Sequence, residues 1–443
     1  MTLRNCLLLV LLAVTPAWSQ VKSAGATSTF NPDDADLMQL PPLINARPFP
    51  VLTGSEVTTN SVNLFLSAQP AYNDNVLVDY GTKPIGSPTY SVQSNMAIDR
   101  TTPLFHVDLG YLPGFTVFQR VNARSAAYQT VGLHSEYRVT PQVTASISDS
   151  FHQSSDVFEQ LASPSAISGS VSAPPNDIIP PFADRIRNSA SGELTDQYAQ
   201  NAMVGVGGST SFLEFPDPAQ APDLYNSGSW GGSGFFNRRL NGTQYAGAIY
   251  LYTKILEFPP SGVILVHTQN FMAYYSALFP SGLSISIAAG PQRFDLTDAP
   301  LPASASWTPA VMGSIAWQTD RFNVAATGSR MVSGGGGLLG NYQTSTVHAL
   351  TRWRTTRYVS LQAGVNYTSR NNVSPLYVRG FPGGSSVSGM ASLGRSLTEH
   401  MDVKVGYARA HYAYPGVVSL SADPNVDRVF ASFTYNFKHP LGR

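Results

Sequence analysis

Apolar and polar residues alternate in short segments along most of this chain. In the final segment, residues 428–437, every second residue is apolar or aromatic, and the residues between them are small and polar. The apolar positions are Val429, Ala431, Phe433, Tyr435 and Phe437. A period of two predicts a β-strand whose two faces meet different surroundings. Such a strand suits a membrane barrel with lipid outside and a wet lumen inside, although a strand of a soluble sandwich can alternate in the same way.

The same alternation recurs along the chain and predicts eighteen strands. The second, sixth and eighth are the least regular, which leaves sixteen strands as an alternative. The predicted strands cover residues 62–68, 89–98, 105–111, 131–139, 143–147, 187–195, 202–212, 229–240, 249–255, 263–279, 283–290, 311–317, 322–327, 347–354, 359–368, 387–396, 403–407 and 428–437. Beyond the N-terminus no apolar run is long enough for a spanning helix, so a membrane-embedded form of this chain must be a closed barrel.

The connections between predicted strands alternate between short and long. After even-numbered strands they are tight turns such as Asn241–Gly242 and Pro280–Ser281, whereas most others are longer, up to residues 154–184. Outer-membrane barrels show this asymmetry, with the short turns on the periplasmic side. We therefore predict an all-β, transmembrane, antiparallel up-and-down β-barrel with both termini in the periplasm. Its first and last strands must pair, near Ser67 and Thr434. A secreted sandwich or solenoid, the soluble alternative, does not predict this parity.

In each strand the apolar set is expected to face lipid and the polar set the lumen. In the ninth strand, Ile249 and Leu251 are assigned to lipid, and Tyr250 and Lys254 to the lumen. The charged members of the polar sets are the lumen-lining candidates Asp108, His134, Glu136, Arg138, Lys254, Arg352, Arg354 and Lys404. Their mixed signs predict no strong selectivity for ions of one charge. The hydroxyls, amides and tyrosines between them also suit sugars. Alternatively they only hydrate the interior, with loops folded in to close it.

Composition agrees with a barrel and narrows the range of partners. The chain has 27 basic and 27 acidic residues, and only 12% of its residues are charged, about half of the usual fraction. Zero net charge argues against nucleic acid as a partner. The mean hydropathy of −0.06 resembles that of a soluble protein, yet a barrel that alternates apolar and polar positions averages to the same value.

The N-terminus predicts secretion. Arg4 precedes the apolar run Leu7–Val14, and Ala17–Ser19 supplies the small residues of a cleavage site. Residues 1–19 are therefore expected to be a signal peptide that is removed. Cys6, the only cysteine, lies in this segment, which leaves the mature chain without thiol or disulfide chemistry.

The mature chain divides into an arm and a barrel. Residues 20–55 lack periodicity and are predicted to form a flexible periplasmic arm, with a plug inside the barrel as the alternative. Residues 56–443 are assigned to the barrel, and the predicted location is the cell outer membrane. The expected partners are outer-membrane lipid and lipopolysaccharide, the barrel-assembly machinery and glycans, but not nucleic acid.

Two sets of residues have the types needed for catalysis. His134, Glu136 and Arg138 share one face of a strand, as do His106 and Asp108. Barrel hydrolases combine such residues with a serine, and no serine stands in a recognisable arrangement with either set. The histidines are scattered, and no metal-ligand spacing recurs. We therefore predict no enzyme activity, no catalytic residues, no metal and no cofactor.

One glycine-rich segment resembles a phosphate-binding loop. Gly334–Gly337 is a run of four glycines, but neither a helical pattern nor a Lys-Ser/Thr pair follows it. We interpret it as the tip of a loop instead.

Several short motifs resemble those of poorly characterised bacterial outer-membrane β-barrels that are found with exopolysaccharide or exosortase systems. The motifs are Tyr72–Val76, Leu109–Phe115, Ala288–Gln292 and Phe433–Arg443, and the similarity covers most of the mature chain. The resemblance implies a barrel, an outer-membrane address and involvement in polysaccharide export, and it supplies no catalytic residues. One departure is that Lys438–Arg443 follows the final aromatic residue, Phe437, which leaves open how assembly machinery reads this end.

Two functions follow from the predicted barrel. The first is a porin-like or export-associated barrel that passes or guides hydrophilic solutes, including polysaccharide, because the predicted lumen face is polar. The alternative is a closed structural or surface-binding barrel that uses its long extracellular loops, of which residues 154–184 form the longest.

Overall fold

The structure is a computed structural model, and every element in its described part is a β-strand. It describes residues 49–50, 60–76, 84–102, 104–120, 126–154, 170–171, 184–219, 223–260, 262–297, 304–319, 321–356, 358–373, 383–415 and 425–440. Within these residues no helix is long and apolar enough to cross a membrane.

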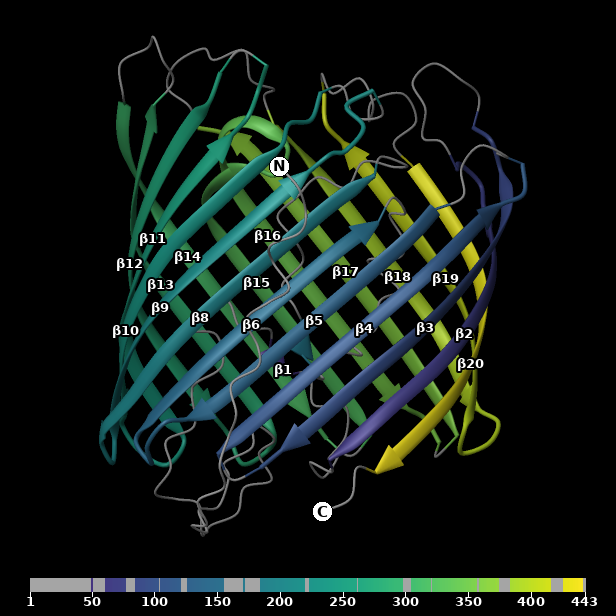
Figure 1. The fold of residues 1–443 in the computed structure, drawn as a ribbon, viewed down its shortest axis with the longest axis horizontal. Coiled ribbons are helices and arrows are strands. Elements are labelled where there is room, and N and C mark those ends of the chain that lie inside the picture. Colours follow the sequence, from purple (N-terminus) through teal and green to yellow (C-terminus); the bar gives the residue numbers. More distant parts are fainter. Residues whose placement is uncertain are drawn as a thin grey trace, which may run out of the picture.

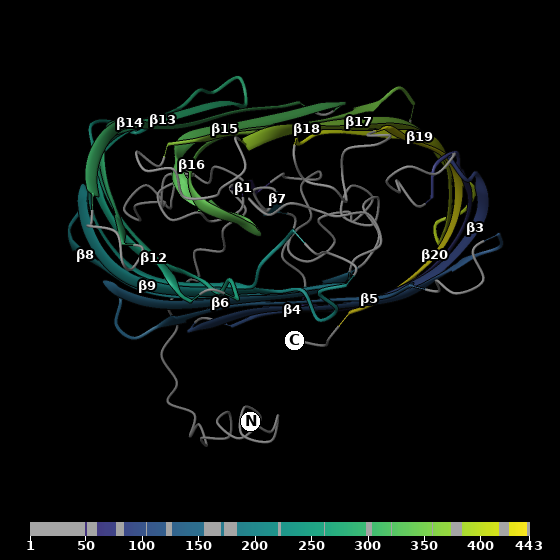
Figure 2. The same cartoon turned by 90° about the horizontal axis from the view of Figure 1, so that it is seen from above.

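Eighteen strands form one closed antiparallel barrel, drawn from the side in Figure 1 and from above in Figure 2. The barrel strands are β2 (Ser61–Asn73), β3 (Ser87–Thr101), β4 (Phe105–Phe118), β5 (Ala126–Arg138), β6 (Val143–Ser154), β8 (Arg185–Ala199), β9 (Ala202–Glu214), β10 (Ser227–Arg239), β11 (Gln244–Glu257), β12 (Ile264–Leu278), β13 (Leu283–Thr297), β14 (Ser304–Gln318), β15 (Phe322–Gly335), β16 (Leu338–Arg354), β17 (Val359–Asn372), β18 (Gly383–Ser396), β19 (Met401–Ala413) and β20 (Asn425–Pro440). Each strand pairs with its neighbours in sequence. The predicted fold and the predicted count of eighteen are confirmed.

The barrel closes where its first and last strands meet. Ser67 of β2 lies opposite Thr434 of β20, and the Thr434 hydroxyl donates a hydrogen bond of 3.1 Å to Ser67 Oγ. Beside this pair, Leu66 lies opposite Tyr435 on the other face of the sheet. The predicted pairing of the two terminal strands is therefore confirmed, and neither strand is left with an open edge.

The two rims of the barrel differ as the connection lengths predict. At one rim, which we call the short-turn rim, the connections are residues 102–104, 139–142, 200–201, 240–243, 279–282, 319–321, 355–358 and 397–400. Several of these turns repeat one local device, in which a Thr hydroxyl accepts the backbone N–H three residues later. Thr319 and Phe322 form such a pair at 3.0 Å, and so do Thr398 and Met401. This bond competes with continued strand pairing and favours a tight turn.

At the opposite end, the long-loop rim, most connections are longer. The exception is the connection between β15 and β16, which consists of Gly336 and Gly337 alone. Both have positive φ angles, of 63° and 111°, which only glycine adopts easily. The four-glycine segment is thus the end of β15 and the tight turn of a long hairpin.

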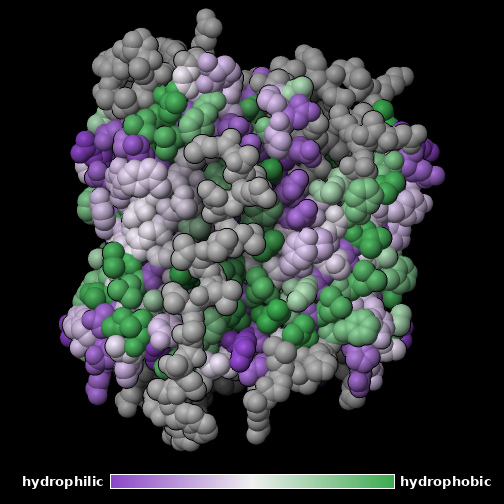
Figure 3. Space-filling model, viewed as in Figure 1, coloured by the Kyte–Doolittle hydropathy of each residue, from purple (hydrophilic) through white to green (hydrophobic). Residues whose placement is uncertain are grey.

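The outward face of the barrel is apolar around the ring. Exposed residues of this kind come from most strands, and they include Leu66, Val92, Ile147, Val206, Phe271, Ile287, Trp307, Val365, Leu393, Val405 and Phe433. Figure 3, which views the barrel from one side, shows many hydrophobic side chains on this surface. In β20 the outward set contains Phe433, Tyr435 and Phe437, as the alternation predicts.

One strand faces the opposite way from the prediction. In β11, Ile249 is 3% exposed and lies opposite Phe235 of β10 and Met272 of β12, both of which are buried on the inward face. Lys254 lies opposite Trp230, which is 49% exposed. The assignment of Lys254 to the lumen is therefore wrong, because the neighbouring strands fix the register and place Lys254 outward.

The predicted arm lies almost entirely outside the described residues and stays a prediction, as does the signal peptide. From the arm, only β1 (Phe49–Pro50) is described, and it pairs with β7 (Ser170–Val171) of the longest connection. Figure 2 draws this short pairing inside the ring of barrel strands.

Candidate functional site in the barrel lumen

The structure places seven of the eight predicted lumen residues on the inward face. Strand registers carry this assignment around the ring, because residues directly opposite each other on antiparallel strands share a face. The inward residues are Asp108, His134, Glu136, Arg138, Arg352, Arg354 and Lys404. Lys254 is the exception described above.

Near the short-turn rim, the inward charges of β3–β8 are mainly acidic and those of β16–β19 mainly basic, while Arg239 of β10 lies outside both groups. Asp99, Asp108, Glu136 and Glu193 lie on β3, β4, β5 and β8, and all of them face the lumen. Arg138 is the basic residue among these acidic ones. We call this part of the barrel the acidic wall.

The opposite part carries three basic residues and one acidic residue, Asp402, and is called the basic wall. Arg352 and Arg354 lie near the end of β16, and Lys404 lies near the start of β19. Asp402 is beside Lys404 and accepts hydrogen bonds from Ser396 Oγ at 2.6 Å and from Asn436 Nδ2 at 2.9 Å. In Figure 2, β17 and β18 run along one long side of the flattened ring, and β4, β5 and β6 run along the other. The two walls therefore face each other, which creates a field across the lumen.

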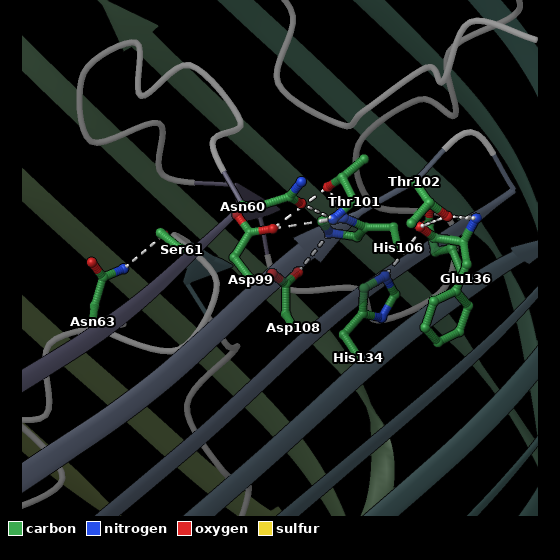
Figure 4. A network of polar contacts seen from close by, with 11 residues as sticks. Asn60, Ser61, Asn63, Asp99, Thr101, Thr102, His106, Asp108, His134 and Glu136 are labelled. Carbon is green, nitrogen blue, oxygen red and sulfur yellow. Dashed lines mark hydrogen bonds and ion pairs between the residues drawn. The ribbon is translucent and has the colours of Figure 1, made fainter. Parts of the chain in front are cut away.

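A chain of histidines and carboxylates runs along the acidic wall (Figure 4). His106 Nε2 lies 2.8 Å from Asp108 Oδ2, and His106 Nδ1 lies 2.7 Å from Thr101 Oγ1. On the next strand, His134 Nε2 lies 3.2 Å from Glu136 Oε1. The centroids of the two imidazole rings are 6.4 Å apart. The residues are thus linked in two adjacent groups that open to the same lumen.

The structure adds a serine that the sequence does not reveal. Ser148 of β6 lies opposite His134, and its Oγ is 2.8 Å from His134 Nδ1. Ser148, His134 and Glu136 have the residue types of an acyl-transfer triad. Backbone N–H groups of β5 and β6 are used in strand pairing at this level, whereas an oxyanion hole requires donors aimed at the substrate. The group therefore does not favour hydrolysis over a hydrogen-bonded lumen surface.

At the long-loop rim the β15–β16 hairpin leaves the wall and enters the lumen. Pairing of β14 with β15 ends at Val311 and Arg330, although β15 continues to Gly335. Figure 2 shows part of β16 curving inside the ring, and the hairpin contains the start of this strand, at Leu338. Val332 would point outward by alternation, yet it is only 2% exposed. The hairpin is a strand pair folded inward, and it narrows the lumen.

Two polar side chains from other strands hold this hairpin by its backbone. Gln292 of β13 accepts the N–H of Val332 at 2.6 Å and donates to its carbonyl at 2.8 Å. Glu257 of β11 accepts the N–H of Gly335 at 3.3 Å and that of Gly340 at 2.8 Å. Gln292 and Glu257 are both almost completely buried. Buried backbone groups need such partners once they leave a sheet.

One backbone hydrogen bond and several apolar contacts complete the attachment of the hairpin. The N–H of Tyr225, in the β9–β10 connection, donates to the carbonyl of Gly337 at 2.8 Å. A side chain at Gly337 would meet Phe215 and Leu224 at 3.2 to 3.4 Å. Leu339 packs against Ile264 and Val266 of β12. The hairpin therefore crosses one end of the lumen, from the β14 side to the β9–β10 connection.

Sequence reasoning missed the hairpin, its two anchors and three buried arginines. Arg185, Arg370 and Arg428 are each 1% exposed and face inward near the long-loop rim. Arg370 Nη1 donates to the Tyr414 hydroxyl at 2.5 Å. Each of these arginines lies on the polar face of its strand. The same feature identified the predicted lumen residues and could have identified these three.

Comparisons with known proteins reveal similar barrels but no family. No protein-family model matches the chain, and no curated protein matches it. Among solved structures it is similar to the outer membrane protein opdK from Pseudomonas aeruginosa, with 10% identity, a TM-score of 0.40 and coverage of 85% of this chain and 99% of that one. Acinetobacter baumannii OccAB2 gives 10% identity, a TM-score of 0.42, and 87% and 99% coverage. The FrpB iron transporter from Neisseria meningitidis is similar as well, with 9% identity, a TM-score of 0.41 and coverage of 84% of this chain and 66% of that one. At these identities and scores the likeness assigns neither a family nor a substrate.

Proposed function

We propose that this protein is a porin-like outer-membrane barrel that passes hydrophilic solutes through a lumen narrowed by the β15–β16 hairpin. The observation that carries the proposal is the closed ring of strands with an apolar outward face and a polar, charged inward face at one rim. A closed barrel is the form in which β-strands can span a membrane, because it leaves no backbone group unpaired in lipid.

The proposed orientation follows from the rims. Short turns lie on the periplasmic side of outer-membrane barrels, and longer connections lie outside. The short-turn rim, where β2 begins and β20 ends, is therefore assigned to the periplasm, and both chain termini are proposed to lie on that side. The inward hairpin then lies near the extracellular entrance, and the acidic and basic walls lie near the periplasmic exit.

The solute class follows from the two zones that a solute would meet. The hairpin limits size at one rim. The facing walls at the other rim orient polar or zwitterionic molecules, because opposite charges line opposite sides. The narrower proposal, that the solute is a polysaccharide and that the barrel serves an exopolysaccharide system, is supported by the lumen amides and hydroxyls and by the sequence resemblance.

Planar-bilayer recording with purified protein tests the proposal. We expect stable conductance steps in the wild-type protein and larger steps in a variant that lacks residues 333–340, because the obstruction is removed. Blocking by added oligosaccharides, but not by apolar solutes of similar size, would support the polysaccharide version. Absence of conductance in both proteins would overturn the pore.

The alternative is a closed barrel that binds partners through its long connections. The pairing of β1 with β7 favours this alternative, since Figure 2 draws it inside the ring. Deletion of residues 155–183 should then abolish partner binding at the cell surface without preventing folding. Conductance of the intact wild-type protein would exclude this alternative.

A further inference from the structure

We propose that Asp99 and His106, with the Thr101 hydroxyl, form a lumenal site for one divalent transition-metal ion, and that Asp108 is the residue that positions His106. The sequence gives no metal-binding spacing, because Asp99 and His106 lie on different strands. The structure brings them together near the short-turn rim (Figure 4).

The site is built from two neighbouring pairs of opposed residues. Asp99 lies opposite Asp108, and Thr101 lies opposite His106, on the inward face of β3 and β4. Side chains in such positions have Cβ atoms about 5 Å apart. Ligand atoms of Asp99, His106 and Asp108 all lie within 4.8 Å of one another. A rigid sheet thus holds one imidazole and two carboxylates at ligand spacing.

Asp108 directs one nitrogen of His106 toward Asp99. Asp108 Oδ2 lies 2.8 Å from Nε2, and a carboxylate there favours a proton on Nε2. Nδ1 then presents a lone pair. Metal-binding histidines in proteins are commonly oriented in this way by a carboxylate on the other nitrogen.

Three potential ligand atoms lie close together: His106 Nδ1, Thr101 Oγ1 and Asp99 Oδ1. Nδ1 lies 2.7 Å from Thr101 Oγ1 and 4.0 Å from Asp99 Oδ1, and these two oxygens are 3.5 Å apart. Ligands at about 2.1 Å from a zinc-sized ion lie about 3.0 to 3.4 Å from one another, depending on whether the geometry is octahedral or tetrahedral. Metal binding therefore requires the Thr101 hydroxyl to move away from Nδ1 and the Asp99 carboxylate to move closer to it. The hydroxyl is the weakest of the three ligands.

The surroundings supply charge and access. The side chains of Asp99 and His106 are 33% and 20% exposed, so an ion can enter from the lumen and keep water ligands. Glu136, opposite His106, and His134, with its ring 6.4 Å away, are the nearest titratable groups on β5. An imidazole together with a carboxylate favours zinc, cobalt or nickel over magnesium or calcium, which prefer oxygen ligands alone.

Calorimetric titration of the purified, folded barrel with Zn²⁺ tests the site, with Mg²⁺ as the comparison ion. We expect one Zn²⁺ per barrel and much weaker binding of Mg²⁺. The variants Asp99→Asn and His106→Ala should lose binding, and Asp108→Asn should weaken it by about 10- to 100-fold, as for other orienting partners. Absorption of bound Co²⁺ reports the coordination directly, and a folded barrel is verified for each variant by its heat-dependent gel mobility.

The matched control is His267→Ala. His267 faces outward on β12, and its Nδ1 also bonds a hydroxyl, that of Tyr252, at 2.8 Å. This variant should bind Zn²⁺ as the wild type does. The proposal is overturned if the wild type shows no saturable Zn²⁺ binding, if Asp99→Asn retains full affinity, or if His134→Ala abolishes binding while His106→Ala does not.

The site does not depend on the proposed pore. A barrel that binds Zn²⁺ without conducting current would disprove the pore and leave the metal site intact. A barrel that conducts but does not bind Zn²⁺ would disprove the metal site alone.

Discussion

Two regions of the barrel wall differ in the polarity of their inward faces. In β17 and β18 the inward residues are mainly polar, for example Gln362, Ser388 and Ser392, and the outward residues are mainly apolar. From β9 to β14 the inward face is apolar as well. It carries a buried cluster of Met203, Phe235, Tyr245, Ile249, Met272, Tyr274, Ala288 and Ala310. One wall has a single apolar face, and the other has two.

Close packing explains how large side chains fit on the inward face from β9 to β14. The Phe235 ring lies over Gly205 of the adjacent strand, where an added side-chain carbon would come within 2.2 Å of the ring. The Tyr274 ring lies over Gly247 in the same way, at 2.5 Å. Large rings thus lie along the wall at glycine positions instead of extending into the lumen. The inward cluster behaves as a small hydrophobic core built on the barrel wall.

The comparison shows what alternation alone can decide. A period of two identifies a strand whichever way it faces, but the direction is evident only when one face is clearly polar. In β11 both faces contain large apolar or aromatic residues, such as Ile249 and Tyr250. Direction there is set by the neighbours, because register places Ile249 beside Phe235 and Met272.

The largest expected effect is on the stability of the region from β9 to β14, where both faces of the sheet are apolar. Ile249→Ala removes a side chain that is 3% exposed and should lower the free energy of unfolding by about 2–5 kcal/mol, as for other buried aliphatic residues. Ser392→Ala, at an inward and buried position of β18, should change it by less than about 1 kcal/mol. Guanidinium unfolding in lipid vesicles measures both. Equal costs would contradict the distinction between the walls.

In β17 and β18, the effect of a substitution on stability should depend on whether the side chain faces lipid or the lumen. Val387 and Ser388 are adjacent on β18, and Val387 is exposed on the outward face. Val387→Arg should lower stability by up to about 2–4 kcal/mol, because it places a charge on the lipid-facing side of the strand. Ser388→Arg enters the lumen, where water reaches the charge, and should have little effect. The same unfolding measurement decides, and an equal loss in both variants would show that this face is not lipid-exposed.

The sequence was sufficient for features that repeat locally. Strand number, the parity of the connections and the pairing of Ser67 with Thr434 all follow from short-range alternation and from the need to remove sheet edges. The structure confirms each of them. Direction was also correct wherever one face was clearly polar, as in β20.

Features that depend on distant segments were not predictable from the sequence. The β15–β16 hairpin folds inward because Glu257 and Gln292, on strands far away in sequence, bind its backbone. The separation of basic from acidic residues arises because β16–β19 and β3–β8 face each other only in the closed ring. Asp99 joined His106 for a related reason, since pairing and not spacing sets their distance.

The attachment of the hairpin should show a smaller effect than the wall substitutions. Glu257→Gln replaces one carboxylate oxygen by an NH₂ group that faces a backbone N–H, so one of the bonds to Gly335 and Gly340 is lost. A buried donor left without a partner costs about 1–3 kcal/mol. Hydrogen exchange at residues 333–340 should accelerate accordingly, and single-channel current should fluctuate more. The control Glu214→Gln, an exposed carboxylate at the same rim, should change neither, and unaltered exchange in Glu257→Gln would show that the anchor is not needed.

The smallest effect separates the two lysines that the sequence treated alike. Lys254 faces outward, with its Nζ 5.6 Å from the centre of the Trp230 ring, and Lys404 faces the lumen on the basic wall. Lys254→Ala should cost about 0.5–1 kcal/mol, the usual value of an exposed cation–π contact, and should leave ion selectivity unchanged. Lys404→Ala removes a lumenal positive charge and should shift the reversal potential in a salt gradient toward that of a more cation-selective pore. A comparable shift in Lys254→Ala would mean that β11 faces as the alternation predicted and that its register in the barrel is wrong.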